Sequence, residues 1–270
     1  MKTSNHLLRR LTAALLAAVL ALSIALPVFA SDDGDTIYIN SVSDLLSLAK
    51  SCAYDQWSVG KTVILQKDLS LEGMLWEPIP SFSGQFKGNG HTISDLTITG
   101  QYSPAGLFGI VEEQGSIESL SVRGIVSVSD SADTTTGGIV GINHGTLINC
   151  QFTGVVTGDS EVGGIVGRNE SEGTIDHSTA RAIVTGKSST GGIAGYNLGA
   201  ITGCTNVGSI NTEYQEASLD TDGFTAKMVD QINNKMAAAD DDATNSVTNV
   251  ATDTGGIAGR SSGMILTSVN

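Results

Sequence analysis

Residues 137–150 read GGIVGINHGTLINC, and the Gly-Gly-Ile motif that opens them recurs through the second half of the chain. Three further copies begin at Gly163, Gly191 and Gly255, and a weaker copy, AGLFG, occupies residues 105–109. Self-similarity at a fixed period of roughly 20–50 residues is the sequence signature of repeat architectures. The greater part of the chain therefore consists of stacked repeats.

The repeats align on an apolar residue that follows each motif in a Gly-x-apolar step. The segment GHTI at residues 90–93 extends this series by one unit. Successive apolar residues are 24, 30, 28, 26 and then 64 residues apart. They define a column of side chains that we expect to be buried and stacked: Ile93, Ile117, Leu147, Ile175, Ile201 and Ile265.

Each unit of 24–30 residues reads as three short strands separated by glycine turns, for example over residues 137–142, 146–152 and 154–157. A unit this small cannot bury its apolar face alone, so neighbouring units must bury it by stacking. A leucine-rich repeat would need regular Leu and Asn positions, and a propeller blade would need about 40 residues in four antiparallel strands. The pattern predicts an all-β, right-handed parallel β-helix.

A polar column also runs along the repeats. Asn143, Asn169 and Asn197 each stand two residues after the last glycine of the motif. Asparagine tolerates the left-handed backbone of tight turns, and side-chain amides stacked about 4.8 Å apart can hydrogen-bond along the stack. We interpret the column as a structural asparagine ladder, with ligand binding as the alternative.

The chain has only three cysteines, too few for a disulfide framework in a protein of this length. Cys150 and Cys204 share a column but lie two coils apart. Two coils span about 9.6 Å, whereas a disulfide tolerates Cα separations only up to about 7 Å. We expect both cysteines to be buried free thiols.

Residues 31–80 are predicted to form an N-terminal cap. They contain strand patterns at 36–39, 62–65 and 69–71, and a helix that starts after Ser41 and carries Leu45 and Leu48 on one face. Because an open solenoid end exposes strand edges and core, we expect this helix to cover it. Residues 81–270 are assigned to the β-helix. The last repeat stops inside a coil, so we expect the natural chain to continue beyond Asn270 or to be truncated there.

The 64-residue spacing indicates an insertion at about residues 212–252. Its apolar residues Phe224, Met228, Ile232 and Met236 follow helical periodicity, and Asp222 precedes them as a plausible N-cap. We expect an acidic helical insertion that packs on the outside of the coil or binds a partner.

Residues 1–30 have the features of a secretory signal peptide. Basic residues precede an apolar run over 11–26, and Val28 and Ala30 place small residues before the cleavage site. The remaining 28 acidic and 11 basic residues give a net charge of 11 − 28 = −17. An acidic surface repels phosphate backbones, so we expect no nucleic-acid partner. No second apolar run of spanning length follows the leader, so we expect no membrane span after signal cleavage. The predicted location is secreted or at the cell surface.

No group of residues forms a recognisable catalytic, cofactor-binding or metal site. A β-helix polysaccharide lyase or hydrolase would need carboxylates, or Ca²⁺ ligands and a base, meeting on adjacent coils. Glu118 and Asp176 share a column, but Ile148 stands between them. The histidines after the leader, His91, His144 and His177, fall on different coils and in different columns. We therefore expect no enzyme activity, no cofactor and no metal.

Residues 137–150 resemble the GLUG repeat, and residues 163–178 and 191–204 resemble further copies. The segment WEPIP at 76–80, followed by FKGNGHTI at 86–93, is similar to the sequence that leads into such repeats. The GLUG family occurs in exported bacterial proteins, including adhesin-like surface proteins and the N-terminal parts of immunoglobulin-A-cleaving metallopeptidases. In that family the repeats are non-catalytic and the protease motif lies elsewhere, so the resemblance implies non-catalytic repeats. The protease motif is absent from this sequence, and peptidase activity is therefore not implied.

The sequence favours an exported, non-enzymatic bacterial surface repeat protein that acts as a scaffold or adhesin-like module. Its partner would be a host or matrix ligand, protein or glycan, whose identity the sequence does not specify. Two alternatives stay open: a carbohydrate-active β-helix enzyme, and the recognition arm of a larger surface metallopeptidase.

Overall fold

The computed structural model describes residues 35–54, 56–128, 134–211 and 252–270. The chain divides into two units, Met1–Thr36 and Ile37–Asn270. The described residues of the second unit form a parallel β-solenoid of about six turns with a single small helix, which confirms the predicted fold class. The predicted signal peptide and most of the predicted helical insertion lie outside the described residues.

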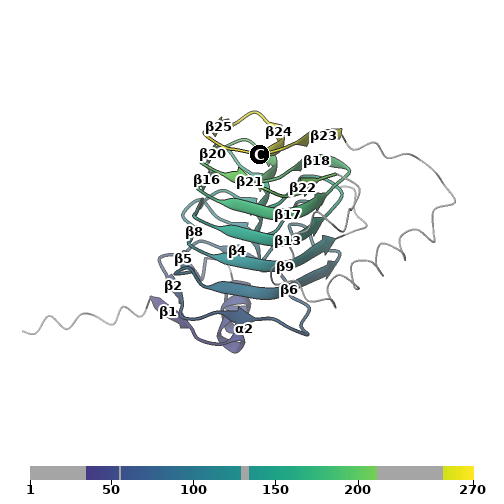
Figure 1. Ribbon diagram of the computed structural model, residues 1–270. Coiled ribbons are helices and arrows are strands. Elements are labelled where there is room, and N and C mark those ends of the chain that lie inside the picture. The colour runs from purple at the N-terminus through teal and green to yellow at the C-terminus, as the bar shows by residue number, and fades with distance from the viewer. Residues whose placement is uncertain (1–34, 55, 129–133, 212–251) are drawn as a thin grey trace, which may run out of the picture. The chain divides into compact units, whose positions relative to one another are not determined.

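The strands stack into four sheets that run along the solenoid (Figure 1). Sheet A contains, in spatial order, β1 (Thr36–Ile39), β2 (Thr62–Leu65), β5 (Gln85–Lys87), β8 (Ser116–Glu118), β12 (Thr146–Ile148), β16 (Thr174–Asp176), β20 (Ala200–Thr202) and β25 (Met264–Leu266). Sheet B contains β3 (Leu69–Ser70), β6 (Thr92–Gly100), β9 (Ser121–Val128), β13 (Gln151–Thr157) and β17 (Thr179–Thr185), and then the short strands β21 (Thr205–Asn206) and β22 (Ser209–Ile210).

Sheet C contains β4 (Ile79–Phe82), β7 (Phe108–Val111), β11 (Val140–Asn143), β15 (Val166–Asn169), β19 (Ala194–Asn197) and β24 (Ala258–Ser261). The short sheet D contains β10 (Thr136–Gly137), β14 (Val162–Gly163), β18 (Ser188–Gly191) and β23 (Thr252–Gly255). The registered pairings from β2 to β25 are parallel, and equivalent positions of the repeat stand opposite each other, as at Gly137↔Gly163, Val140↔Val166 and Leu147↔Ile175.

A complete coil has four strands, so the prediction of three was wrong. The segment 137–142, expected to be one strand, is divided between β10 and β11 at Gly138 and Ile139. The segment 146–152 is divided at Asn149, whose φ of 52° puts its backbone in the left-handed region. The same corner recurs in later coils at His177 (φ 46°) and Thr267 (φ 47°). Gly203, with a φ of 61°, occupies this corner in the coil between them, but Asn149, His177 and Thr267 do not share its residue type, so the column did not stand out as a turn.

The paired glycines of the motif lie at the corner between sheets D and C. A Cβ on Gly163 would overlap the carbonyl oxygen of Val166, and a Cβ on Gly164 would overlap that of Gly192 in the next coil. Any other residue would force the coils apart at this corner. The motif recurs because consecutive coils approach each other too closely here for a side chain.

The first member of the predicted buried column was assigned wrongly. Phe86, not Ile93, stands opposite Ile117 in sheet A. Ile93 instead pairs with Val122 in sheet B, where a register shift after Ile93 accommodates the longer strand β6. The sequence Gly84-Gln85-Phe86 also satisfies the Gly-x-apolar step, so the correct alternative was present in the sequence.

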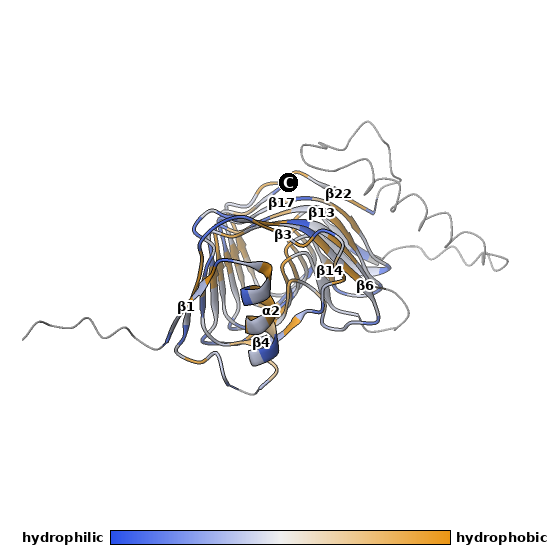
Figure 2. Cartoon of the chain, turned by 90° about the horizontal axis from the view of Figure 1, so that it is seen from below, coloured by the Kyte–Doolittle hydropathy of each residue, from blue (hydrophilic) through white to orange (hydrophobic). Residues whose placement is uncertain are grey.

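The N-terminal helix α2 (Val42–Ser51) closes one end of the solenoid (Figure 2). Ser41 caps it, because its Oγ accepts a hydrogen bond from the Asp44 N–H at 3.2 Å, while Asp44 Oδ2 accepts one from the Asn40 N–H at 2.9 Å. Leu45 and Leu48 are buried against the core. The predicted strand at 36–39, the helix and the strand at 62–65 are confirmed.

Replacing Ile175 by Asp should destabilise the solenoid by several kcal/mol, because Ile175 is fully buried between Leu147 and Ile201 and the carboxylate would have no partner there. The matched control is Thr174→Asp on the same strand, where the side chain is half-buried and the cost should be below about 1 kcal/mol. Urea unfolding followed by circular dichroism measures both. Equal losses in the two variants would contradict the assignment of inward and outward faces.

Candidate functional site

The predicted apolar column forms the wall of the core on sheet A. Ile117, Leu147, Ile175 and Ile201 stand directly opposite one another in successive strands, and each is fully buried. Ile265 continues the column opposite Ile201 but is 39% exposed. The difference arises because β25 is the terminal strand of sheet A, so no described strand covers Ile265 from the other side.

The three asparagines of the polar column are fully buried and hydrogen-bonded in series. Asn143 Nδ2 donates to Asn169 Oδ1 at 2.8 Å, and Asn169 Nδ2 donates to Asn197 Oδ1 at 2.8 Å. Asn143 also closes its own turn, since its Nδ2 donates to the Gly145 carbonyl and its Oδ1 accepts from the Gly145 N–H. The series ends at Ser261, whose Oγ accepts from Asn197 Nδ2 at 3.2 Å. With their amides engaged in this way, these side chains hold one coil to the next.

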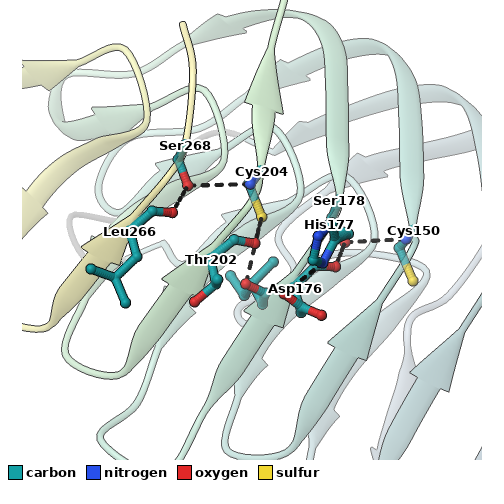
Figure 3. A network of polar contacts seen from close by, with 9 residues as sticks. Cys150, Asp176, His177, Ser178, Thr202, Cys204, Leu266 and Ser268 are labelled. Atoms are coloured by element: carbon teal, nitrogen blue, oxygen red, sulfur yellow. Dashed lines mark hydrogen bonds and ion pairs between the residues drawn. The ribbon is translucent and has the colours of Figure 1, made fainter.

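Cys150 and Cys204 are buried free thiols at one corner of the solenoid. Ser178 occupies the equivalent position in the coil between them, and Ser268 follows Cys204 (Figure 3). The Cys150 N–H donates to Ser178 Oγ at 3.1 Å, and the Cys204 N–H donates to Ser268 Oγ at 3.2 Å. Each serine therefore bonds the backbone of the preceding coil. The thiols also link coils: Cys150 Sγ donates to the Ile148 carbonyl of its own coil and to the Ile117 carbonyl of the preceding one. Cys204 Sγ likewise donates to the carbonyls of Thr202 and Ile175.

The titratable side chains of sheet A lie where the sequence placed them. Glu118 and Asp176 occupy one outward column with Ile148 between them, because the three residues stand opposite one another in β8, β12 and β16. His177 Nδ1 lies 2.8 Å from Asp176 Oδ1 on the surface. His91 Nδ1 lies 3.2 Å from Asp68 Oδ1 in a separate coil. Among residues 35–54, 56–128, 134–211 and 252–270, no group of three or more His, Cys, Asp or Glu side chains is arranged to hold a metal ion.

The sequence did not predict one feature, an outward-facing cluster of side chains centred on Arg168. The Arg168 guanidinium lies 2.8 Å from Glu161 Oε1 and 2.7 Å from Glu170 Oε1, and its Cζ is 5.0 Å from the ring centroid of Tyr196 in the next coil. The Cζ atom of Arg260, one coil further, lies 5.5 Å from the centroid of the same Tyr196 ring. The signal was the residue that follows the last glycine of each motif, which is Ile142, Arg168, Tyr196 and Arg260 in successive coils.

The fold and these columns define a parallel β-solenoid built from glycine-rich repeats. Residues 158–185, which contain β14 to β17, match the GLUG motif. The predicted resemblance is therefore confirmed for one complete coil, and the remaining coils repeat its register.

Two proteins of longer sequence are similar to parts of the chain. Halomucin from Haloquadratum walsbyi is 32% identical over 155 residues, which cover 53% of this chain and 2% of halomucin. A protein of Evansella cellulosilytica assigned as a Gly-rich membrane protein is 29% identical over 137 residues, which cover 37% of this chain and 16% of that protein. The chain thus spans a small fraction of the length of either relative.

Among solved structures, one from Bacteroides ovatus assigned as an immunoglobulin A1 protease aligns with 65% of this chain and 66% of its own, with 16% identity and a TM-score of 0.44. Within the described part of this chain, no helix is both long and apolar enough to cross a membrane.

Replacing Asn169 by Ala should cost about 2–4 kcal/mol of stability, because it removes the buried partner of both Asn143 Nδ2 and Asn197 Oδ1. Asn40→Ala is the matched control, since Asn40 is exposed and should tolerate the change within about 0.5 kcal/mol. Chemical denaturation of the two variants measures the difference. A loss no larger than that of the control would show that the ladder contributes little to stability.

Burial raises the pKa of Cys150 to about 12 and that of Cys204 to about 11, above the ordinary value of 9.0. Because the thiolate is the reactive form, both thiols of the native protein should resist iodoacetamide at about pH 8 and react after unfolding. The raised pKa values favour the folded state below the unfolded pKa near 9, and this contribution is lost as the pH rises toward 11–12.

Mass spectrometry of alkylated peptides tests this expectation, with the protein in concentrated guanidinium chloride as the positive control. Rapid labelling of the native protein, or a bridge between Cys150 and Cys204, would contradict the assigned coil positions.

Proposed function

We propose that the protein is an exported, non-enzymatic surface repeat protein that acts as a scaffold or adhesin-like module. The observation that carries the proposal is the contrast between inward and outward columns. Inward positions repeat the same chemistry from coil to coil, as at Asn143, Asn169 and Asn197, and these residues bond to one another. Outward positions of the same motif change from Ile142 to Arg168 to Tyr196. A repeat of this kind maintains its fold while its surface is free to diversify.

Export is supported by the leader pattern of residues 1–30 and by the acidic character of the rest of the chain. The similarity to halomucin and to a protein assigned as a membrane protein supports a location at the cell surface. A parallel solenoid suits this location, because each coil contacts only its neighbours and the length can grow without a larger core.

The outward face of sheet C is the surface that we propose for contact with a host or matrix ligand. There Tyr196 lies between Arg168 and Arg260 in successive coils, in a chain with only 14 basic residues. Arginine and tyrosine are enriched in binding surfaces, since both offer a planar apolar body and hydrogen-bond donors.

Antibody labelling of intact cells of the bacterium that produces the protein should detect it at the surface without permeabilisation. The matched control is Leu15→Arg/Leu16→Arg, which interrupts the apolar run of the leader and should confine the protein to permeabilised cells. Labelling only after permeabilisation of cells with the unchanged sequence would contradict export.

Incubation of the purified protein with pectins, glycosaminoglycans and mucin glycans should release no reducing ends or unsaturated products. Binding to immobilised glycans or matrix proteins, measured by surface plasmon resonance, should weaken with Tyr196→Ala and be unchanged with Arg181→Ala on sheet B. Product release would contradict the non-enzymatic role. Equal effects of the two substitutions on binding affinity would contradict the assignment of the contact surface to sheet C.

A further inference from the structure

One corner between sheets A and B is longer than its counterparts in later coils. Four residues, 88–91, connect β5 to β6, whereas only two residues, 119–120, connect β8 to β9. The corners between β12 and β13 and between β16 and β17 also contain two residues each. The additional residues are not needed for stacking, because the shorter corner closes the later coils.

The longer corner is a tight turn that is held in place. Asn89 and Gly90 both have positive φ, 53° and 77°. The His91 N–H donates to the Gly88 carbonyl at 2.9 Å. These are the features of a type I′ β-turn, for which Asn-Gly is a preferred central pair. Asn89 Nδ2 also donates to the Leu65 carbonyl of the preceding coil at 3.3 Å, so the turn is anchored to the solenoid.

This turn and the following coil border a shallow polar groove of about 340 Å³ on the outer surface. The described residues that line it are Lys87, Asn89, Gly90, Glu118 and Ser119, and none of them is apolar. The Gly90 N–H donates to the Ser119 carbonyl at 2.7 Å and thereby joins the two walls. The volume lies at the lower end of the range for small-molecule sites, and the lining suits a hydrophilic ligand.

The charged groups of the groove are not satisfied by one another. Lys87 and Glu118 stand directly opposite each other in β5 and β8, where opposite charges attract. Both side chains are half-buried, yet within the described residues neither has a hydrogen-bond or ion-pair partner. Asp176, two coils further in the same column as Glu118, is by contrast paired with His177. The ammonium and the carboxylate at the groove are therefore available to a ligand.

The hydrogen-bonding capacity of these groups selects the class of ligand. The Lys87 ammonium only donates hydrogen bonds and the Glu118 carboxylate only accepts them, whereas Ser119 Oγ can do both. The charges of Lys87 and Glu118 cancel, so a singly charged ligand would compensate one and leave the other unpaired. The acidic chain also repels anions. Two adjacent hydroxyl groups of a neutral sugar satisfy both residues, since a hydroxyl can donate or accept.

We propose that this groove binds one ring of a neutral sugar through two adjacent hydroxyl groups. Lys87 Nζ donates to one hydroxyl, and the Glu118 carboxylate accepts from the other. Because the turn already fixes Asn89 beside them, little chain entropy is lost when the sugar binds. The groove is separate from the Tyr196 surface of sheet C, so this inference goes beyond the proposed function and does not depend on it.

Saturation-transfer NMR of the full chain tests the proposal with methyl β-D-galactopyranoside, methyl α-D-mannopyranoside and methyl β-D-glucopyranoside as probes. At least one of the three should bind at millimolar concentration. Tetrahydropyran-2-methanol, which has the ring without adjacent hydroxyls, should not bind. Glu118→Gln and Lys87→Met should each raise the Kd of the bound glycoside at least about tenfold, because each removes a hydrogen bond to a charged group.

The matched control is Asp176→Asn, which makes the same kind of change in the same column two coils away and should leave the Kd unchanged. Lys87→Arg keeps a charged donor and should retain the binding that Lys87→Met loses. Urea unfolding should give the same midpoint for Lys87→Met, Glu118→Gln and the unchanged chain, since both positions face outward.

Binding of none of the three glycosides would overturn the proposal. So would an unchanged Kd in Glu118→Gln and Lys87→Met, an equal loss in Asp176→Asn, or binding of glycine in place of the glycosides. Tyr196→Ala should not alter glycoside binding, and surface labelling of cells does not respond to the groove. Failure of this site is therefore distinguishable from failure of the proposed function.

Discussion

The stacking of coils in register is the constraint on which the rest of the structure depends. In sheet A the same position of each repeat lies opposite its equivalent, as in Leu147, Ile175 and Ile201, so that each apolar residue is buried by the copies before and after it. No coil has a core of its own, because its strands are only two to nine residues long. The free energy that holds a coil in place therefore comes mainly from its neighbours.

In-register stacking restricts the sequence at two kinds of position. At the corner before sheet C, Gly164 is required because a side chain would overlap the next coil. At the end of sheet C, Asn169 is buried, and its amide bonds to the equivalent asparagines in the coils before and after it and to the Gly173 carbonyl. An unpaired buried amide costs about 1–3 kcal/mol, so each asparagine favours a further asparagine in the neighbouring coil. The repeat pattern in the sequence is the consequence.

The same constraint explains which features the sequence predicted. The inward columns and the fold class could be predicted from the sequence. An inward residue contacts the equivalent residue of the next coil, so the two must be similar in size and polarity. The α2 cap could be predicted because Ser41 and Asp44 act locally. The division of each coil into four strands could not be predicted, because the corner residues Asn149 and His177 adopt a left-handed backbone although neither is a glycine. The Arg168 cluster could not be predicted from repeated residue types, because its members differ in type from coil to coil.

The two ends of a one-dimensional stack are its weakest places, because a terminal coil has one neighbour where an internal coil has two. At the first end α2 supplies the missing contact and buries Leu45 and Leu48. In the last described coil, Ile265 stands opposite Ile201 and has the same identity, but it is partly exposed whereas Ile201 is fully buried. The difference shows that an inward residue needs the coil that follows it as well as the coil before it for complete burial. The burial of each apolar column is therefore a property of the stack and not of any one repeat.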